Sequence, residues 1–209
     1  MDEQQYWDKT HDKYATTDWI GKPSLFAEWT LQYLPEGGAL VDLGAGQAQD
    51  SRFFAGKGFD VIATDISAHA LDLAKSKSAA IAYQVVNLAM PLPFADEQFD
   101  VVYAHLSLHY FDAATTHALF AEIERVLKPG GVLAALFNSD QDPEIPEGEE
   151  IEPNYIKIDG IQKRYFNPEA AKDFAKGFEI VVADNQGTTY KDEAKGVHNL
   201  IRLVARKPA

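Results

Sequence analysis

The feature that most constrains the fold is an apolar run, Leu40-Val-Asp-Leu43, followed by two glycines, Gly44 and Gly46. Such a run is typical of a short strand buried inside a parallel sheet. The glycines allow the backbone to turn sharply and to approach a ligand closely. Residues 47–57 have helical character, so the free N–H groups of a helix N-terminus should face the same turn. A strand, a glycine turn and a helix in this order predict a nucleotide-type binding site.

Two acidic residues indicate which nucleotide the site takes. Asp42 lies at the carboxyl end of the strand, and Asp65 follows a second apolar run, residues 61–64. The second acid is placed to bind ribose hydroxyls. At the turn, Asp42 would repel a pyrophosphate but would hold an ammonium group, and Gln49 stands where the dinucleotide pattern G-x-G-x-x-G has its third glycine. S-adenosylmethionine (SAM) fits better, because it has a ribose, an adenine, a sulfonium and an amino-acid end but no phosphate.

Three motifs resemble those of the class I SAM-dependent methyltransferases: Val41–Ala48, Ala63–Ser67 and Leu127–Gly131. Residues 44–67, with Asp50 among them, look most like the small bacterial branch near the tellurite-resistance-type methyltransferases. The general resemblance extends over residues 36–139. It implies an α/β fold, a Rossmann-like three-layer sandwich around a seven-stranded, mostly parallel sheet with an antiparallel last strand. Ala48 stands where many relatives have a third glycine, and alanine has less freedom at positive φ.

The resemblance also implies that SAM is the cofactor and that residues at the strand ends hold it. Asp42 would anchor its amino end and Asp65 would bind its ribose. Asn87 follows the third strand, where this family meets the adenine; its side-chain oxygen could accept from the adenine amino group or satisfy its own backbone in a turn. The residues expected at the cofactor are Tyr14, Asp42, Gly44, Gly46, Asp65, Ile66, Asn87, Leu88 and His105.

Two histidines follow the fourth predicted strand, which ends at Ala104. Residues just past the carboxyl end of such a strand face the crevice of the sheet, so His105 should lie near the cofactor and His109 nearer the methyl acceptor. An imidazole titrates near neutral pH, and His109 is therefore the candidate catalytic residue, as a general base. The alternative is that both histidines only pack and form hydrogen bonds.

The chain is expected to form one methyltransferase domain over residues 1–209, with residues 1–35 as an N-terminal helical cap. The resemblance implies that Tyr14 closes over SAM from this cap; the alternative is that the aromatic residues of the cap pack on the sheet. Residues 140–166 are predicted to be an inserted loop and hairpin near the acceptor site, because Asp159-Gly160 is a hairpin turn signal.

The first part of this insertion, residues 140–152, is rich in acid. Seven of its thirteen residues are acidic, none is basic, and Pro143 and Pro146 disfavour regular structure. We expect an irregular surface loop whose charges are solvated. The other interpretation is a lid that attracts a cationic substrate.

The overall charge narrows the classes of partner. With 19 basic and 32 acidic residues the net charge is 19 − 32 = −13, which disfavours nucleic acid and anionic membrane surfaces. We expect a small-molecule methyl acceptor and a cytoplasmic protein. The chain has no cysteine, which excludes disulfides, thiolate zinc sites and a cysteine nucleophile, and no metal site is predicted. The sequence does not indicate the oligomeric state.

Methyl transfer is the expected function. The sulfonium already makes the methyl group electrophilic, so such an enzyme mainly has to orient a nucleophile in line with it. Two alternatives stay open. One is a non-catalytic SAM-binding or regulatory protein on the same fold. The other, disfavoured by Asp42 and Gln49, is an NAD(P)-linked oxidoreductase.

Overall fold

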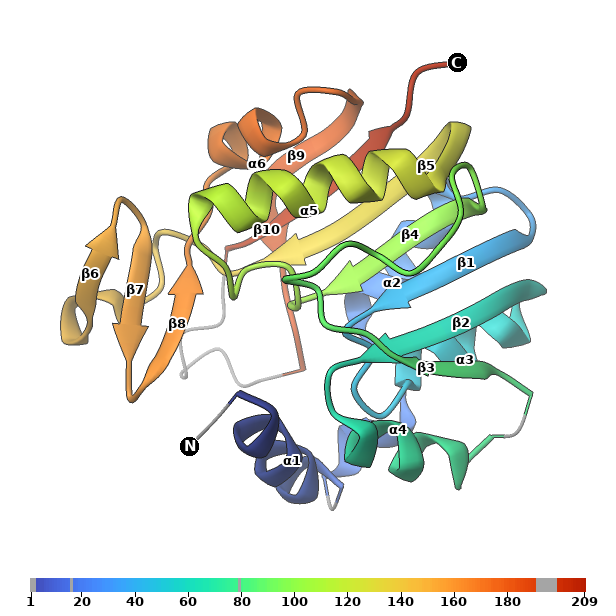
Figure 1. The fold of residues 1–209 in the computed structure, drawn as a ribbon, viewed down its shortest axis with the longest axis horizontal. Coiled ribbons are helices and arrows are strands. Elements are labelled where there is room, and N and C mark those ends of the chain that lie inside the picture. Colours follow the sequence, from blue (N-terminus) through green and yellow to red (C-terminus); the bar gives the residue numbers. More distant parts are fainter. Residues whose placement is uncertain (1–2, 16, 79, 191–198) are drawn as a thin grey trace.

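The computed structural model of the protein describes residues 3–15, 17–78, 80–190 and 199–209. Its centre is a seven-stranded sheet in the order β3-β2-β1-β4-β5-β10-β9, with helices on both faces (Figure 1). Neighbouring strands from β3 to β5 are parallel, whereas β10 is antiparallel to both β5 and β9. The predicted fold, with its antiparallel last strand, is confirmed. The strands of this sheet are β1 (Gly38–Leu43), β2 (Phe59–Asp65), β3 (Ala82–Val85), β4 (Phe99–His105), β5 (Leu127–Phe137), β9 (Glu179–Gly187) and β10 (Leu200–Arg206).

Helices cover both faces of the sheet and form the two outer layers. In Figure 1, α5 and α6 lie on one face of the sheet, and α3 lies on the other. The α-helices are α1 (Glu3–Tyr14), α2 (Leu25–Thr30), α3 (Gln49–Gly56), α4 (Ala68–Lys75), α5 (Ala113–Val126) and α6 (Pro168–Phe174). Short 3₁₀ turns are η1 (Asp18–Gly21), η2 (Leu31–Tyr33) and η3 (Ile145–Glu147). None of the helices within the described ranges is long and apolar enough to span a membrane.

The central strand β1 is buried on both sides. Val41 packs in the apolar cluster that contains Ile123 of α5, and Leu40 packs in the cluster on the opposite face that contains Phe54 of α3. Successive side chains of a strand point to opposite faces, so β1 supports both helical layers. This double burial fixes the carboxyl end of β1, where the glycine turn begins.

The glycine turn keeps a left-handed backbone at the position where alanine replaces glycine. Ala48 has φ +56° and ψ +36°, and its side chain is fully buried. A left-handed conformation costs a non-glycine residue roughly 1–2 kcal/mol. The conformation is held by hydrogen bonds, from the N–H of Ala48 to Ala45 O at 2.8 Å and from Ala45 N to Thr64 O at 2.6 Å. These two backbone hydrogen bonds hold the turn in its left-handed conformation despite that cost.

A buried carboxylate ties the N-terminal segment to the sheet. Asp50 of α3 accepts hydrogen bonds from the Ser24 backbone N–H (2.6 Å), the Ser24 hydroxyl (2.8 Å) and the Tyr103 hydroxyl (2.7 Å). All three residues are at most 4% exposed. Ser24 also caps α2 as the sequence predicts, since its hydroxyl accepts from Ala27 N at 3.0 Å. One carboxylate thereby joins α2, α3 and β4.

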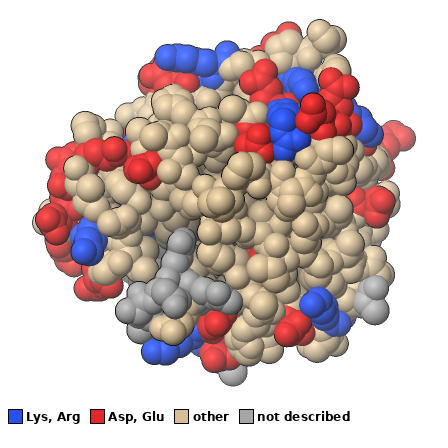
Figure 2. All heavy atoms as spheres, viewed as in Figure 1, with Lys and Arg blue, Asp and Glu red and all other residues tan. Residues whose placement is uncertain are grey.

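The insertion after β5 contains more regular structure than the sequence indicates. Its strands β6 (Glu149–Glu152), β7 (Tyr155–Ile158) and β8 (Ile161–Arg164) form a small antiparallel sheet. The expectation of an irregular loop through residue 152 is wrong for β6, because the two prolines restrict only the residues before it. The β7–β8 turn has positive φ at Asp159 and Gly160, as in tight hairpin turns. Acidic side chains gather over this sheet, on the left of Figure 2.

Candidate active site

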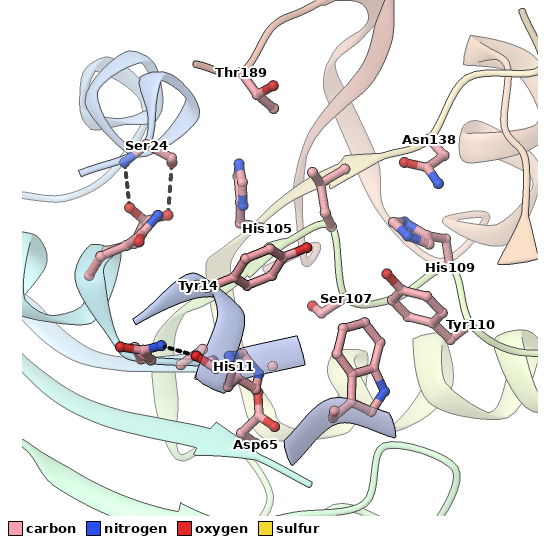
Figure 3. A pocket seen from close by; sticks show the side chains of 18 of the residues that line it. His11, Tyr14, Ser24, Asp65, His105, Ser107, His109, Tyr110, Asn138 and Thr189 are labelled. Atoms are coloured by element: carbon pink, nitrogen blue, oxygen red, sulfur yellow. Dashed lines mark hydrogen bonds between the residues drawn. The ribbon is translucent and has the colours of Figure 1, made fainter. Parts of the chain in front are cut away.

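A cavity of about 800 Å³ opens at the carboxyl ends of the parallel strands. It is bounded by the glycine turn, α1, the loop after β4 and the insertion (Figure 3). Every residue that the sequence predicts at the cofactor or at the acceptor lines it; their roles stay predictions. They are Tyr14, Asp42, Gly44, Gly46, Asp65, Ile66, Asn87, Leu88, His105 and His109.

Gly44 brings the turn against the loop that follows β4. A side-chain carbon at Gly44, which has φ +74°, would overlap Ser107. The hydroxyl of Ser107 donates to the Leu43 carbonyl at 2.5 Å. The absence of a side chain at Gly44 therefore sets how closely the loops after β1 and β4 approach at the floor of the cavity.

Asp65 links the glycine turn to the start of α4. Its carboxylate accepts from Gly46 N at 2.8 Å and from Ser67 N at 2.9 Å. The side chain is 7% exposed. Burial raises the pKa of Asp65 above its usual range, while the backbone N–H of Ser67 and the nearby His11 act in the opposite direction. A carboxylate in this position can accept further hydrogen bonds from hydroxyl groups in the cavity.

Asp42 is more deeply buried, at 2% exposed, and accepts a hydrogen bond from the Ser51 hydroxyl at 2.5 Å. Burial, and next the charge of Asp50, raise the pKa of Asp42 to about 8. The carboxyl group therefore holds a proton at neutral pH until a positive charge comes near. A ligand ammonium group would lower this pKa and favour the carboxylate that binds it.

The side chain of Asn87 forms a hydrogen bond with the backbone of its own turn. Its side-chain oxygen accepts from Ala89 N at 2.9 Å, two residues along the chain. Of the two interpretations that the sequence leaves open, this contact is the one expected for a turn asparagine. Its exposed side chain still borders the cavity beside Val86, a buried apolar residue that no motif marked.

His109 lies in the loop after β4, lines the cavity and is 1% exposed. Burial, and next the charges of Lys163 and His105, lower the pKa of His109 to about 3. Its carbonyl accepts from Arg164 N of β8 at 2.6 Å, so the insertion is attached to the loop after β4. Its Nδ1 is buried and has no hydrogen-bond partner among the described residues. The imidazole is thus neutral at physiological pH, with a polar atom available to a ligand.

The insertion contributes a charged pair to the cavity wall. The Lys163 ammonium lies 2.6 Å from the Glu144 carboxylate, which also accepts from the Tyr165 hydroxyl at 2.6 Å. Glu144 belongs to the acid-rich segment, so part of that segment faces the cavity rather than solvent. No sequence pattern marks this pair, because Glu144 precedes η3 and Lys163 lies in β8, and only the packing of the insertion brings them together.

Aromatic rings from α1 close the cavity from another side. Trp7 packs edge-on against Tyr110, with ring centroids 4.9 Å apart. In Figure 3 the ring of Tyr14 projects into the cavity. Burial raises the pKa of Tyr14, so its hydroxyl stays protonated. The helix α1 thus forms part of the site, as well as packing on the rest of the domain.

Comparisons with known proteins find methyltransferases among the similar sequences. Residues 41–135 match a family model described as "Methyltransferase domain". An uncharacterised methyltransferase of Synechocystis is 36% identical over 117 residues, which cover 55% of each chain. The chain spans between 20% and 55% of the length of the first curated relatives that it matches.

Solved structures share the fold at low sequence identity. A SAM-dependent methyltransferase from Mesorhizobium loti superimposes with a TM-score of 0.69 at 22% identity, over 87% of this chain and 98% of that one. A Burkholderia thailandensis 1,6-didemethyltoxoflavin-N1-methyltransferase, solved with its acceptor and S-adenosylhomocysteine (SAH), has a TM-score of 0.73 at 17% identity. That alignment covers 98% of this chain and 85% of the other.

Proposed function

We propose that the chain belongs to the class I SAM-dependent methyltransferases and transfers a methyl group from SAM to a small-molecule acceptor, because residues 41–135 match a methyltransferase domain and the fold is that of a solved SAM-dependent methyltransferase. One observation carries the proposal. Asp42 and Asp65 lie at the ends of neighbouring strands and line one cavity on either side of the glycine turn. This placement of the two carboxyl groups suits a ligand that has an ammonium group at one end and a ribose further along.

The bound cofactor supplies an electrophilic methyl group, and the chain supplies orientation. Asp42 would hold the amino end as a carboxylate, and Asp65 would hold the ribose. The absent side chains at Gly44 and Gly46 make room for Ser107 and His11, which pack against the turn beside the ligand. Fixing the two reactants in line can supply much of the reduction in the barrier, so this reading needs no dedicated catalytic group.

The shape of the cavity supports a small acceptor. Its volume of about 800 Å³ is within the range of about 300–1,000 Å³ that small ligands occupy. Residues of α1 and of the insertion line the end of the cavity that we assign to the acceptor. The 1,6-didemethyltoxoflavin bound to the Burkholderia neighbour is also a small molecule.

The net charge of the chain is −13. A neutral or cationic acceptor is consistent with this charge, and so is a cytoplasmic location for the protein. The resemblance to the tellurite-resistance-type branch stays a prediction.

We assign His109 to acceptor binding rather than to proton removal. With a pKa near 3, its charge does not change between pH 5.5 and 8, so its titration should leave no inflection in the rate. His109→Ala should lower kcat/KM for the acceptor about tenfold, the scale of one lost hydrogen bond and an orphaned partner. The SAH affinity should not change.

The measurement is a pH–rate profile of both proteins with an acceptor found by a substrate screen. His117→Ala is the matched control, because His117 lies on α5 against Phe174, away from the cavity. A rate that rises with a midpoint near pH 6.5 in the native protein, and no longer does so in His109→Ala, would restore the general-base hypothesis.

Thermal unfolding with SAH, and with NAD as control, tests the cofactor assignment. SAH at about 100 times its Kd should add about 2.7 kcal/mol to the free energy of unfolding, which raises Tm by about 5–10 °C for a domain of this size. NAD should give no shift. Binding of SAH without methyl transfer to any member of a broad acceptor panel would instead favour the non-catalytic SAM-binding protein.

A further inference from the structure

The helix α1 lies against the cofactor end of the cavity and is attached there by side chains. The Ser67 hydroxyl at the start of α4 donates to Asp8 at 2.5 Å, and His69 lies 2.7 Å from Asp12. From the glycine turn, the Gln47 amide donates to the His11 carbonyl at 2.9 Å. These contacts place successive turns of α1 over the start of α4 and the glycine turn, beside Asp65.

His11 is the residue of α1 that reaches the glycine turn. It is 7% exposed. A side-chain carbon added at Gly46 would lie 2.8 Å from Cε1 of its ring, so the missing side chain at Gly46 makes room for this imidazole. Figure 3 shows His11 above Asp65. The ring lines the cavity, and its Nδ1 is buried without a hydrogen-bond partner among the described residues.

A buried, unpartnered ring nitrogen is costly unless a ligand satisfies it. Burial lowers the pKa of His11. The charges of Asp65, Asp8 and Asp12 raise it, but the effect of burial is larger. The neutral imidazole offers one N–H and one lone pair. A hydroxyl group can pair with Nδ1 in either tautomer, since it both donates and accepts, whereas an ammonium group only donates.

We propose that His11 binds a ribose hydroxyl of the cofactor, so that the 2′,3′-diol is held by Asp65 on one side and by Nδ1 of His11 on the other. The inference rests on the proposed function, because it takes SAM as the ligand. It makes α1 part of the cofactor site through a specific polar contact. No motif of the glycine turn or of β2 contains this residue.

The test compares ligands that differ only in the diol. Affinities for SAH, 2′-deoxy-SAH and 3′-deoxy-SAH are measured by calorimetry on the native protein and on His11→Ala. We expect His11→Ala to bind SAH about tenfold more weakly, the equivalent of about 1.4 kcal/mol. One of the two deoxy analogues should bind both proteins with affinities equal within about twofold. His11→Asn, whose amide lies near the position of Nδ1, should recover most of the affinity for SAH.

The matched control is Asp12→Ala. Asp12 lies on α1, as His11 does, and its removal breaks the contact with His69 of α4 but leaves the ring of His11 in place. It should weaken all three ligands by one common factor. If His11→Ala also weakens all three equally, the ring only packs α1 and the proposal is overturned. An unchanged SAH affinity in His11→Ala would overturn it too. Failure of the native protein to bind SAH would instead refute the proposed function.

Discussion

Replacing Asp65 by alanine should weaken the binding of SAH by about 1–3 kcal/mol, or about 5- to 150-fold in affinity. Hydrogen bonds to a charged acceptor are the stronger kind, and the substitution removes the group expected to hold the ribose. It also frees Gly46 N, which Asp65 fixes in the glycine turn, so the turn loses part of its preformed shape. Calorimetric titration with SAH measures the loss.

The control for Asp65 is Asp72→Ala, an acid of α4 whose contact is an exposed pair with Lys75. It removes the same charge from the same region without reaching the cavity, and the SAH affinity should stay within about twofold. Because burial raises the pKa of Asp65, its carboxylate is costly in the empty protein, and Asp65→Ala should fold. An SAH affinity equal to that of the native protein would contradict the ribose assignment.

The largest effect on stability is expected for Asp50→Ala, which should lower the free energy of unfolding by about 2–5 kcal/mol. The substitution leaves the Ser24 N–H buried without its acceptor, which costs about 1–3 kcal/mol. The Ser24 and Tyr103 hydroxyls each lose a bond to a charged acceptor and keep only their mutual contact at 3.1 Å. Loss of the Asp50 charge relieves Asp42, whose pKa it raises, and this offsets part of the cost. For a domain of this size Tm should fall by about 4–20 °C.

Thermal and urea unfolding of Asp50→Ala, Tyr103→Phe and Asp173→Ala measure this network. Tyr103→Phe removes one donor and should cost less than Asp50→Ala. Asp173 is an exposed acid of α6 that contacts Lys176, so its removal should change stability by no more than about 0.5 kcal/mol. Equal stabilities for Asp50→Ala and Asp173→Ala would show that the carboxylate does not hold α2 on the sheet.

Local patterns in the sequence predicted the parts of the site that depend on neighbouring residues. The run Leu40-Val-Asp-Leu43 and the glycines after it specify a strand and a turn within a few residues, and Asp65 ends the next strand. The strand order then follows from general rules for parallel sheets. These parts could be predicted because the spacing of the apolar residues, the residue types in the turn and the expected burial all indicate the same structure.

Contacts between distant segments could not be predicted in this way. His11 meets Gly46 although 35 positions separate them (46 − 11 = 35), and α1 carries no motif that marks one face. The pKa of His109 depends on how deeply the insertion buries it, which the residue type does not reveal. The helix cap at Ser24 could be predicted locally, but the contacts of its hydroxyl with Asp50 and with Tyr103 arise only from tertiary packing.

The left-handed alanine at position 48 bears on how well the glycine turn keeps its shape while the cavity is empty. A glycine there could visit many backbone conformations once the cofactor leaves, and each binding event would have to select the right one. Alanine has a single narrow basin at positive φ, and the methyl group of Ala48 is fully buried. The entropy loss of ordering the turn therefore occurs when the chain folds, and it does not recur when a ligand binds to the ordered turn.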